Sequence, residues 1–135
     1  MVLDVLAPCP AVEDGTPPND ASFVLRLRFG EASVLLPGDL ERAGEARVLD
    51  ALGPVTLLKL GHHGSRTSTT DDWVDRLQPR VAIASAGHPS PFGHPHSVVV
   101  DRLAARGIPL WTTTERGGVR VTLHRDGSFE VGPAM

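Results

Sequence analysis

The sequence predicts an α/β (α+β) fold, in which a mixed β-sheet is covered by helices. Three short apolar segments, at residues 34–36, 55–60 and 80–87, have the composition of buried strands. Amphipathic segments with helical spacing separate them, and a hairpin pattern lies on either side of this alternating region. Such alternation is typical of a sheet on which helices pack. We expect a single domain over residues 1–135.

The first part of the chain is predicted to contain three strands and a helix. Residues 2–7 form a short strand, and the Pro-, Gly- and Asp-rich residues 8–20 form a flexible loop. An alternating strand follows, and a turn at residues 30–31 leads into the apolar strand at 34–36. Residues 40–52 have helical spacing, and the Gly-Pro pair after them ends this helix.

The second part of the chain continues the alternation of strands and helices. The predicted elements are, in order, a helix that starts near residue 68 and ends at Pro79, a helix at 97–106, a strand at 108–113 and a hairpin at 117–132. The dipeptide Asp126-Gly127 is a strong signal for a two-residue hairpin turn. Trp73 and Trp111 are both predicted to lie in the core.

Composition and charge exclude several classes of protein. The formal net charge is −3, so any contact with nucleic acid is expected to be local or through metal ions, not through a general cationic face. No apolar run approaches the roughly 20 residues that cross a bilayer. The first residues lack the basic and apolar regions of a signal peptide, so we expect none. Phosphate-binding-loop and dinucleotide fingerprints are absent.

Polar residues capable of binding a metal follow each of the three apolar strands. Asp39 follows the first strand, His62 and His63 follow the second, and the third leads into a segment that contains His94 and His96. In helix-covered sheets, sites assemble at the carboxyl ends of such strands. Imidazole and carboxylate groups are the ligand set for zinc, manganese or iron. We therefore expect a site at this edge of the sheet.

Each of these residues also has a simpler interpretation. Asp39 fits a helix N-cap as well as it fits a metal ligand. One histidine of the pair His94 and His96 fits the cap of the following helix. His62 and His63 fit a site better than an incidental pair, because glycines and an apolar strand flank them.

The remaining polar residues rank lower. His88 and His124 are predicted to be surface residues. Ser65 has no Gly-x-Ser-x-Gly pattern around it, so it fits a hydroxyl that supports a ligand or a phosphate better than a nucleophile. Glu41 fits either a supporting group beside a ligand or an ordinary acid in a first helical turn.

Four segments of the chain combine into one specific pattern over residues 19–121. They read NDASFVLRLRFGEASVLLPGDLE, VTLLKLGHHGSRTS, PRVAIASAG and FGHPH. This pattern resembles the metallo-β-lactamase-like domain of the DNA-internalisation competence protein ComEC family. The resemblance implies half or part of an αββα sandwich, and a hydrolase in which two metal ions activate a hydroxide for attack on a phosphodiester or ester. The implied substrate is DNA, with degradation of the strand that is not transported.

The resemblance also implies roles for individual residues. Asp39 resembles the carboxylate that bridges the metal ions. We assign His63 and His94 to the metal, and His62 and His96 to contact with substrate phosphate or to proton donation. The two members of each histidine pair fit either role by their position in the sequence.

Substrate contacts, cofactor and partners follow from the same resemblance. The expected substrate-binding residues are Asn19, Ser65 and Arg66. The expected cofactor is a divalent metal, manganese or zinc, with one ion or none bound. The expected partners are DNA and either the N-terminal half of the metallo-β-lactamase domain or the membrane channel of the parent protein, with a homodimer also considered. The implied location is the extracytoplasmic side of the cell membrane, as part of a larger membrane protein.

One motif of the family is missing from the chain. The pattern His-x-His-x-Asp-His occurs nowhere, because residues 94–96 have its first spacing but Ser-Val-Val follows. We therefore expect the C-terminal half of the sandwich, with one sheet face uncovered unless a partner covers it. A metal-dependent nuclease or phosphodiesterase completed by the other half is one interpretation. A non-catalytic assembly or DNA-docking module is the alternative, and a lactonase- or phosphocholine-esterase-like hydrolase is a third, weaker one.

Overall fold

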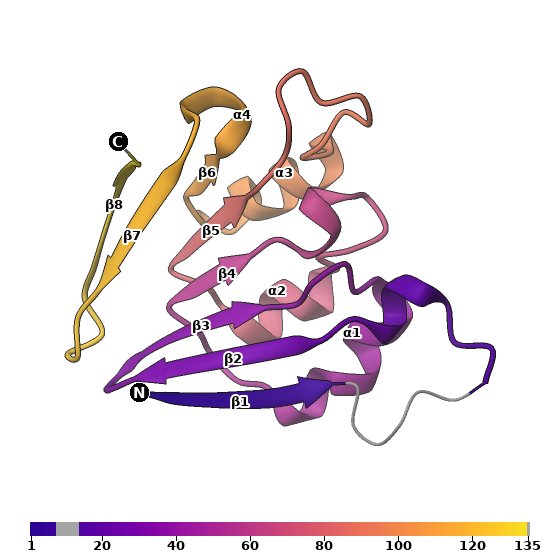
Figure 1. The fold of residues 1–135 in the computed structure, drawn as a ribbon, viewed down its shortest axis with the longest axis horizontal. Helices are drawn as coiled ribbons and strands as arrows, with labels where there is room; N and C mark the ends of the chain where they lie inside the picture. Colours follow the sequence, from indigo (N-terminus) through magenta and orange to yellow (C-terminus); the bar gives the residue numbers. More distant parts are fainter. Residues whose placement is uncertain (8–13, 135) are drawn as a thin grey trace.

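The computed structural model describes residues 1–7 and 14–134 of the chain (Figure 1). The strands in these residues are β1 Val2–Ala7, β2 Val24–Phe29, β3 Ala32–Leu36, β4 Leu57–Lys59, β5 Val81–Ala84, β6 Leu110–Thr112, β7 Val119–Leu123 and β8 Phe129–Pro133. The helices are α1 Arg42–Val48, α2 Asp71–Leu77, α3 Ser97–Ala105 and α4 Thr113–Arg116, with short 3-10 turns η1 Pro18–Ala21, η2 Leu49–Ala51 and η3 Gly61–Gly64. The order of the elements is the predicted one, with the three 3-10 turns and the four-residue helix α4 added.

The first six strands form one mixed sheet in the order β1-β2-β3-β4-β5-β6, and β7 pairs with β8 in a separate hairpin. The strands from β1 to β3 pair antiparallel, whereas those from β3 to β6 pair in parallel. The helices α1, α2 and α3 make the crossovers that parallel pairing requires. The carboxyl ends of β3, β4 and β5 therefore lie at the same edge of the sheet, where the sequence predicts a site.

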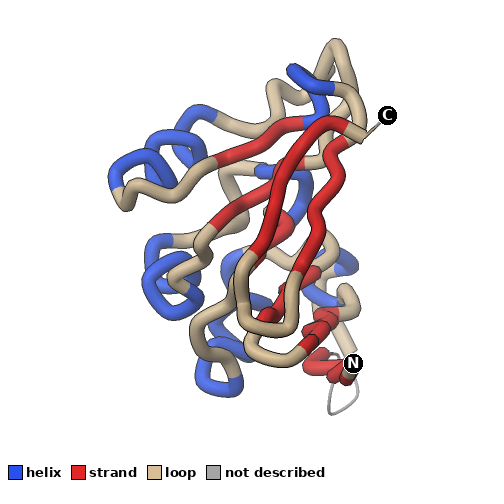
Figure 2. Tube along the Cα trace, turned by 90° about the vertical axis from the view of Figure 1, so that its left-hand side faces the viewer, coloured by secondary structure: helices blue, strands red, loops and turns tan. Residues whose placement is uncertain are grey.

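The hydrophobic core lies between this sheet and the helices α1, α2 and α3, which cover one of its faces (Figure 2). Leu35, Leu58 and Ala82 are opposite one another on neighbouring strands and are all fully buried. Trp73 on α2 is also fully buried, as predicted. Trp111 is only partly buried, so its prediction as a core residue is wrong. It lies on β6, the last strand of the sheet, and the Arg116 guanidinium lies 4.5 Å from the centroid of its indole.

The opposite face of the sheet is covered only in part. The β7-β8 hairpin lies on this side (Figure 2), and the Glu31 N–H donates a hydrogen bond to the Arg125 carbonyl at 2.8 Å. Near β1 large apolar side chains stay exposed, with exposed fractions of 56% for Leu3, 54% for Val5 and 67% for Phe23. Exposed apolar side chains on an edge strand are unusual, and they agree with the expectation of an uncovered face.

The start of α1 differs from the prediction. The helix begins at Arg42, and the side chain of Asp39 does not cap it. Instead, Asp20 Oδ1 accepts hydrogen bonds from the backbone N–H groups of Glu41 at 2.9 Å and Gly44 at 3.0 Å. The simpler interpretation of Asp39 is therefore wrong, because a buried carboxylate from a distant part of the chain already fills the capping role.

Other boundaries differ by a few residues. The apolar segment 55–60 forms only the three-residue strand β4, and α4 interrupts the chain between β6 and β7, where no helix was predicted. Of the predicted loop at 8–20, residues 8–13 lie outside the described residues, and its end forms η1. Every helix in the described ranges is too short or too polar to cross a bilayer.

Candidate active site at the carboxyl ends of the strands

Asp39 lies in the tight turn that follows β3. Gly38 has a φ of 62°, which is the left-handed region that glycine occupies without strain. The Asp39 N–H donates to Ser22 Oγ at 3.1 Å, and the Gly38 carbonyl accepts from the His62 N–H at 3.0 Å. The bond to Ser22 ties the Asp39 turn to the segment before β2, and the bond from His62 ties it to the histidine turn after β4. The Asp39 side chain is 45% exposed, so its carboxylate is open to solvent.

The two adjacent histidines lie in a strained turn. His62 has φ 45° and ψ 45°, and His63 has φ 58° and ψ 19°, so both occupy the left-handed region that non-glycine residues rarely adopt. Such conformations persist only where the surroundings impose them, and they concentrate at functional sites. Here the Gly64 carbonyl accepts from the His96 N–H at 2.8 Å, which joins the turn to the segment before α3.

His63 presents one free ring nitrogen to Asp39. Its Nδ1 lies 2.5 Å from the Ser85 carbonyl oxygen, and a carbonyl only accepts, so Nδ1 carries the proton. In the neutral ring Nε2 then carries no proton, and it lies 3.7 Å from Asp39 Oδ1, which is longer than a hydrogen bond. Both atoms therefore keep lone pairs available for a cation, and a backbone carbonyl that orients a ligating imidazole is a usual feature of metal sites.

His62 lies beside His63 and His94. Its ring centroid is 6.4 Å from that of His63 and 5.9 Å from that of His94, and its Nδ1 lies 3.1 Å from Glu41 Oε1. Glu41 also accepts a hydrogen bond from Thr67 Oγ1 at 2.8 Å. The Thr67 hydroxyl is the largest cause that holds the pKa of Glu41 below its ordinary value, so this carboxyl is ionised at neutral pH.

His94 and His96 lie on the loop that leads into α3. Burial, followed by the neighbouring histidines, lowers the pKa of His94 and so favours its neutral, metal-binding form. The N-cap of α3 is His96, whose Nδ1 accepts from the Val98 N–H at 3.3 Å. The structure thus assigns to His96 the capping role that the sequence left open between the two histidines.

The predicted substrate-binding residues lie in different surroundings. Arg66 is exposed, whereas Ser65 is buried and its hydroxyl lies 2.9 Å from Thr67 Oγ1. Asn19 donates from Nδ2 to Glu41 Oε1 at 3.4 Å, so it contacts the same carboxylate oxygen as His62. The two surface predictions are confirmed, since His88 and His124 are both exposed.

Sequence reasoning missed three residues that hold the site. Asp20 and Ser22 anchor the segment of Asp39 and Glu41, and the Asn-Asp-x-Ser pattern that contains them was the available signal. Lys59 at the end of β4 donates from Nζ to the Leu60 carbonyl at 3.1 Å. Burial lowers the pKa of Lys59, and the Asp39 carboxylate opposes this shift, so the charges of Lys59 and Asp39 are coupled.

A metal ion fits this donor set in part. Asp39 and His63 supply a carboxylate and an oriented imidazole, which are common ligands of zinc and manganese. Within the described residues, however, no group of three or more His, Cys, Asp or Glu side chains converges closely enough to hold an ion. The pair is therefore an open site that needs further donors.

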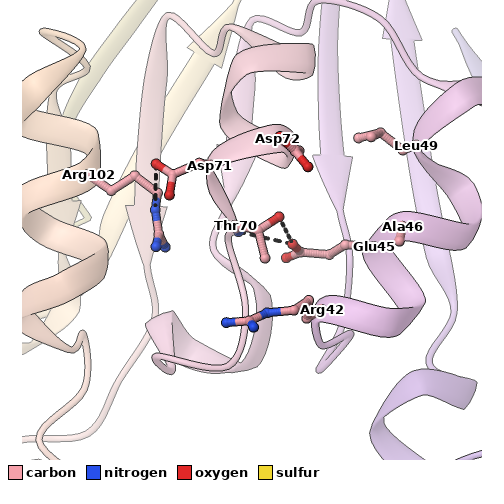
Figure 3. A pocket seen from close by; sticks show the side chains of 8 residues that line it. All are labelled: Arg42, Glu45, Ala46, Leu49, Thr70, Asp71, Asp72 and Arg102. Atoms are coloured by element: carbon pink, nitrogen blue, oxygen red, sulfur yellow. Dashed lines mark hydrogen bonds and ion pairs between the residues drawn. The ribbon is translucent and has the colours of Figure 1, made fainter.

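Two cavities lie on different parts of the molecule. One of about 430 Å³ adjoins the histidines and is lined by His63, Ser85, Ala86, Gly87, Ser90, Pro91, Phe92 and His94. The other, of about 250 Å³, lies where α1, α2 and α3 approach one another and contains Glu45 and Arg102 (Figure 3). In the second cavity Asp71 pairs with Arg102 at 3.0 Å and Glu45 accepts from Thr70, so these three charged groups already have partners.

Comparison with known proteins places the chain in a family. Residues 2–88 match the metallo-beta-lactamase superfamily. The chain is 36% identical over 127 residues to ComE operon protein 3 of Bacillus subtilis (strain 168), which covers 92% of this chain and 16% of that protein. It is 38% identical over 108 residues to Recombination protein 2 of Haemophilus influenzae, with 80% and 14% covered. It is 37% identical over 112 residues to Competence protein ComA of Neisseria gonorrhoeae, with 81% and 16% covered.

The chain thus spans about one sixth of the length of the curated relatives that it matches. These relatives confirm the resemblance to the ComEC family that the motifs indicate. The helix-covered mixed sheet agrees with part of the metallo-β-lactamase fold. With 87 of its 135 residues matched, the chain belongs to the metallo-beta-lactamase superfamily.

Proposed function

We propose that the chain is part of a metal-dependent phosphodiesterase, a nuclease that acts on DNA during its uptake. The observation that carries this proposal is the convergence of Asp39 Oδ1 and His63 Nε2, 3.7 Å apart and not bonded to each other. These atoms lie at the carboxyl ends of β3 and β4, beside His62 and His94. The name of one relative, Competence protein ComA, supports a link to competence.

Each residue has a role in this proposal. Asp39 and His63 would hold a divalent manganese or zinc ion, with His94 as a further ligand. The ion would supply a water of lowered pKa and neutralise phosphate charge. His62 is assigned to proton transfer, while Nε2 of His96 stays available for a phosphate because only Nδ1 is used by the cap.

The open donor set requires completion by other residues. We assign this to an N-terminal half of the metallo-β-lactamase domain, which would also cover the apolar side chains of Leu3, Val5 and Phe23. Burial of exposed apolar surface is the main driving force of such association. The membrane channel of a parent protein, and a place on the extracytoplasmic side of the membrane, belong to the same proposal.

The test is hydrolysis of single-stranded DNA with manganese, by the chain alone and with a separately supplied N-terminal half. We expect cleavage in the completed protein. In Asp39→Ala we expect the cleavage rate to fall at least about 100-fold, because the loss of a group that only supports a metal ligand already costs about 10–100-fold. The matched control is Asp50→Ala, an acid on η2. Absence of cleavage in every combination would reject the nuclease proposal.

A second candidate is a non-catalytic assembly or DNA-docking module. It is favoured by the lack of a three-ligand cluster among the described residues. Elemental analysis of the purified chain separates the candidates. Bound or readily acquired manganese or zinc that is lost in Asp39→Ala supports the hydrolase, whereas a chain that takes up neither metal supports the docking module.

A further inference from the structure

The Glu41 side chain is an acceptor shared by three side chains from separate segments. Its Oε1 lies 3.1 Å from His62 Nδ1, 2.8 Å from Thr67 Oγ1 and 3.4 Å from Asn19 Nδ2. These donors come from η3, from the loop before α2 and from η1, respectively. Because one oxygen joins the three segments, Glu41 fixes where the His62 ring lies relative to its neighbours.

Glu41 does not have the ordinary role of an acid at a helix start. It is the N-cap residue of α1, but its side chain makes no capping hydrogen bond. Asp20 supplies that cap instead, through its bonds to the N–H groups of Glu41 and Gly44. The Glu41 carboxylate is thereby released from the helix and directed toward His62.

We propose that Glu41 is a positioning residue that holds His62 as the Nδ1-protonated tautomer and leaves Nε2 as its working nitrogen. An ionised carboxylate only accepts hydrogen bonds, so the shared proton belongs to Nδ1. Nε2 has no hydrogen-bond partner among the described residues, and the His62 ring faces His94 with centroids 5.9 Å apart. Which imidazole nitrogen reacts is set by the hydrogen bond that the other nitrogen makes.

The backbone supports the same assignment. His62 occupies the left-handed region, and its N–H is held by the Gly38 carbonyl at 3.0 Å. The Gly38 carbonyl thus holds the main chain of His62, and the Glu41 carboxylate holds its ring. Strain that the surroundings impose at a histidine is expected where the direction of the ring matters for function.

The use of Nε2 rests on the proposed function. When water hydrolyses a phosphodiester, a new P–O bond forms to the water oxygen and the P–O bond to the leaving alcohol breaks. The attacking water keeps one hydrogen and releases the other proton to the solvent. The leaving oxygen keeps the electron pair and takes a proton, which we assign to Nε2–H of the doubly protonated His62 ring. His62 is then neutral and still holds its Nδ1 proton against Glu41, and solvent returns a proton to Nε2 before the next turnover. General acid catalysis of this kind contributes typically 10²–10⁴-fold.

The tautomer is tested without any hydrolysis. Long-range ¹H–¹⁵N NMR of the ¹⁵N-labelled full chain, at a pH where its imidazoles are neutral, separates protonated from unprotonated ring nitrogens. His62→Asn identifies the His62 signals among the six histidines. We expect a protonated Nδ1 and an unprotonated Nε2 in the wild type, and a shift of the proton toward Nε2 in Glu41→Ala.

Two further variants make the result specific. Thr67→Val removes another bond to Glu41 but leaves the His62 contact, so it should keep the wild-type tautomer. Glu41→Met preserves the shape of the side chain without an acceptor, and it replaces Glu41→Ala if that variant does not fold. A wild-type His62 protonated on Nε2, or a tautomer unchanged in Glu41→Ala and Glu41→Met, overturns the proposal.

The same variants separate this inference from the nuclease proposal. In a completed, active protein, Glu41→Ala should lower kcat by at least about 10-fold with little change in KM, since it acts through His62 and does not touch the DNA. If no combination cleaves DNA but the tautomer is as expected, the nuclease proposal fails and the positioning role stands. If cleavage occurs and Glu41→Ala retains full kcat, the positioning role fails while the nuclease proposal stands.

Discussion

Glu41 and Glu45 lie four residues apart at the start of α1 and have opposite environments. Glu41 is partly exposed, and hydrogen bonds led by the Thr67 hydroxyl lower its pKa. Glu45 is 1% exposed, and burial raises its pKa against the hydrogen bonds from Thr69 and Thr70 that oppose the shift. A glutamate carboxyl is therefore a charged hydrogen-bond acceptor at residue 41, whereas at residue 45 burial disfavours its ionised form.

The difference follows from what each carboxylate holds. Glu45 Oε2 accepts from the N–H and the hydroxyl of Thr70, at 3.0 and 2.7 Å, and Glu45 Oε1 accepts from the Thr69 N–H, so it anchors the start of α2 (Figure 3). Glu41 accepts from Thr67 and from His62. The two acids thus bind one loop, residues 67–70, at neighbouring points. Glu45 fixes the loop to the core, and this leaves Glu41 free to orient the site.

The largest expected effect is on stability, in Glu45→Ala. The substitution leaves the buried N–H group of Thr69 and the partly buried N–H group of Thr70 without acceptors. Each buried group without a partner costs about 1–3 kcal/mol, so we expect a loss of about 3 kcal/mol. Glu41→Ala should cost only about 0.5 kcal/mol, because its side chain is partly exposed and water can replace it. Urea denaturation measures both values. Equal losses in the two variants would contradict the contrast between them.

This contrast marks the limit of what the sequence predicted. Hydrophobic periodicity predicted the order of the strands and helices, because each element buries one face against a neighbour. It also predicted that Asp39 and His63 lie at one sheet edge, since parallel strands bring their carboxyl ends together. The cap of α1 could not be predicted, because Asp20 reaches it from across the fold. The roles of Glu41 and Glu45 likewise depend on partners more than 20 residues away.

Gly64 in the histidine turn allows a second comparison, between a closely packed glycine and Gly107, which has open space around it. A Cβ on Gly64 would lie 2.7 Å from the Pro95 Cβ, and Gly64 has a φ of 85°. Gly64→Ala therefore adds a clash to the left-handed strain, and we expect a loss of about 2 kcal/mol. Gly107→Ala is the matched control, because Gly107 has a φ of 66° and an added Cβ would meet nothing within 4 Å. It should cost about 1 kcal/mol, from strain alone.

The Gly64 variant also reports on the site. The segment that carries His94 packs on Gly64, so the clash should move His94 away from His62 and weaken metal binding in Gly64→Ala but not in Gly107→Ala. Differential scanning calorimetry and manganese titration measure the two effects. If both variants lose the same stability, close packing against Pro95 is not the reason that residue 64 is a glycine.

The smallest expected effect is the pH dependence that distinguishes the two acids. Both have an ordinary pKa of 4.5. The raised pKa of Glu45 gives stability that is fully present below pH 4.5 and is lost as the pH rises toward its folded pKa. The lowered pKa of Glu41 gives stability that is present above pH 4.5 and is lost as the pH falls toward its folded pKa. The free energy of unfolding of the wild type should therefore fall relative to that of Glu45→Gln as the pH rises above 4.5. Relative to that of Glu41→Gln, it should fall as the pH drops below 4.5. Urea denaturation from about pH 3.5 to about pH 7 measures both differences. If both differences follow the direction expected for Glu41, hydrogen bonding governs both carboxylates; if both follow the direction expected for Glu45, burial governs both. Either result would contradict the contrast.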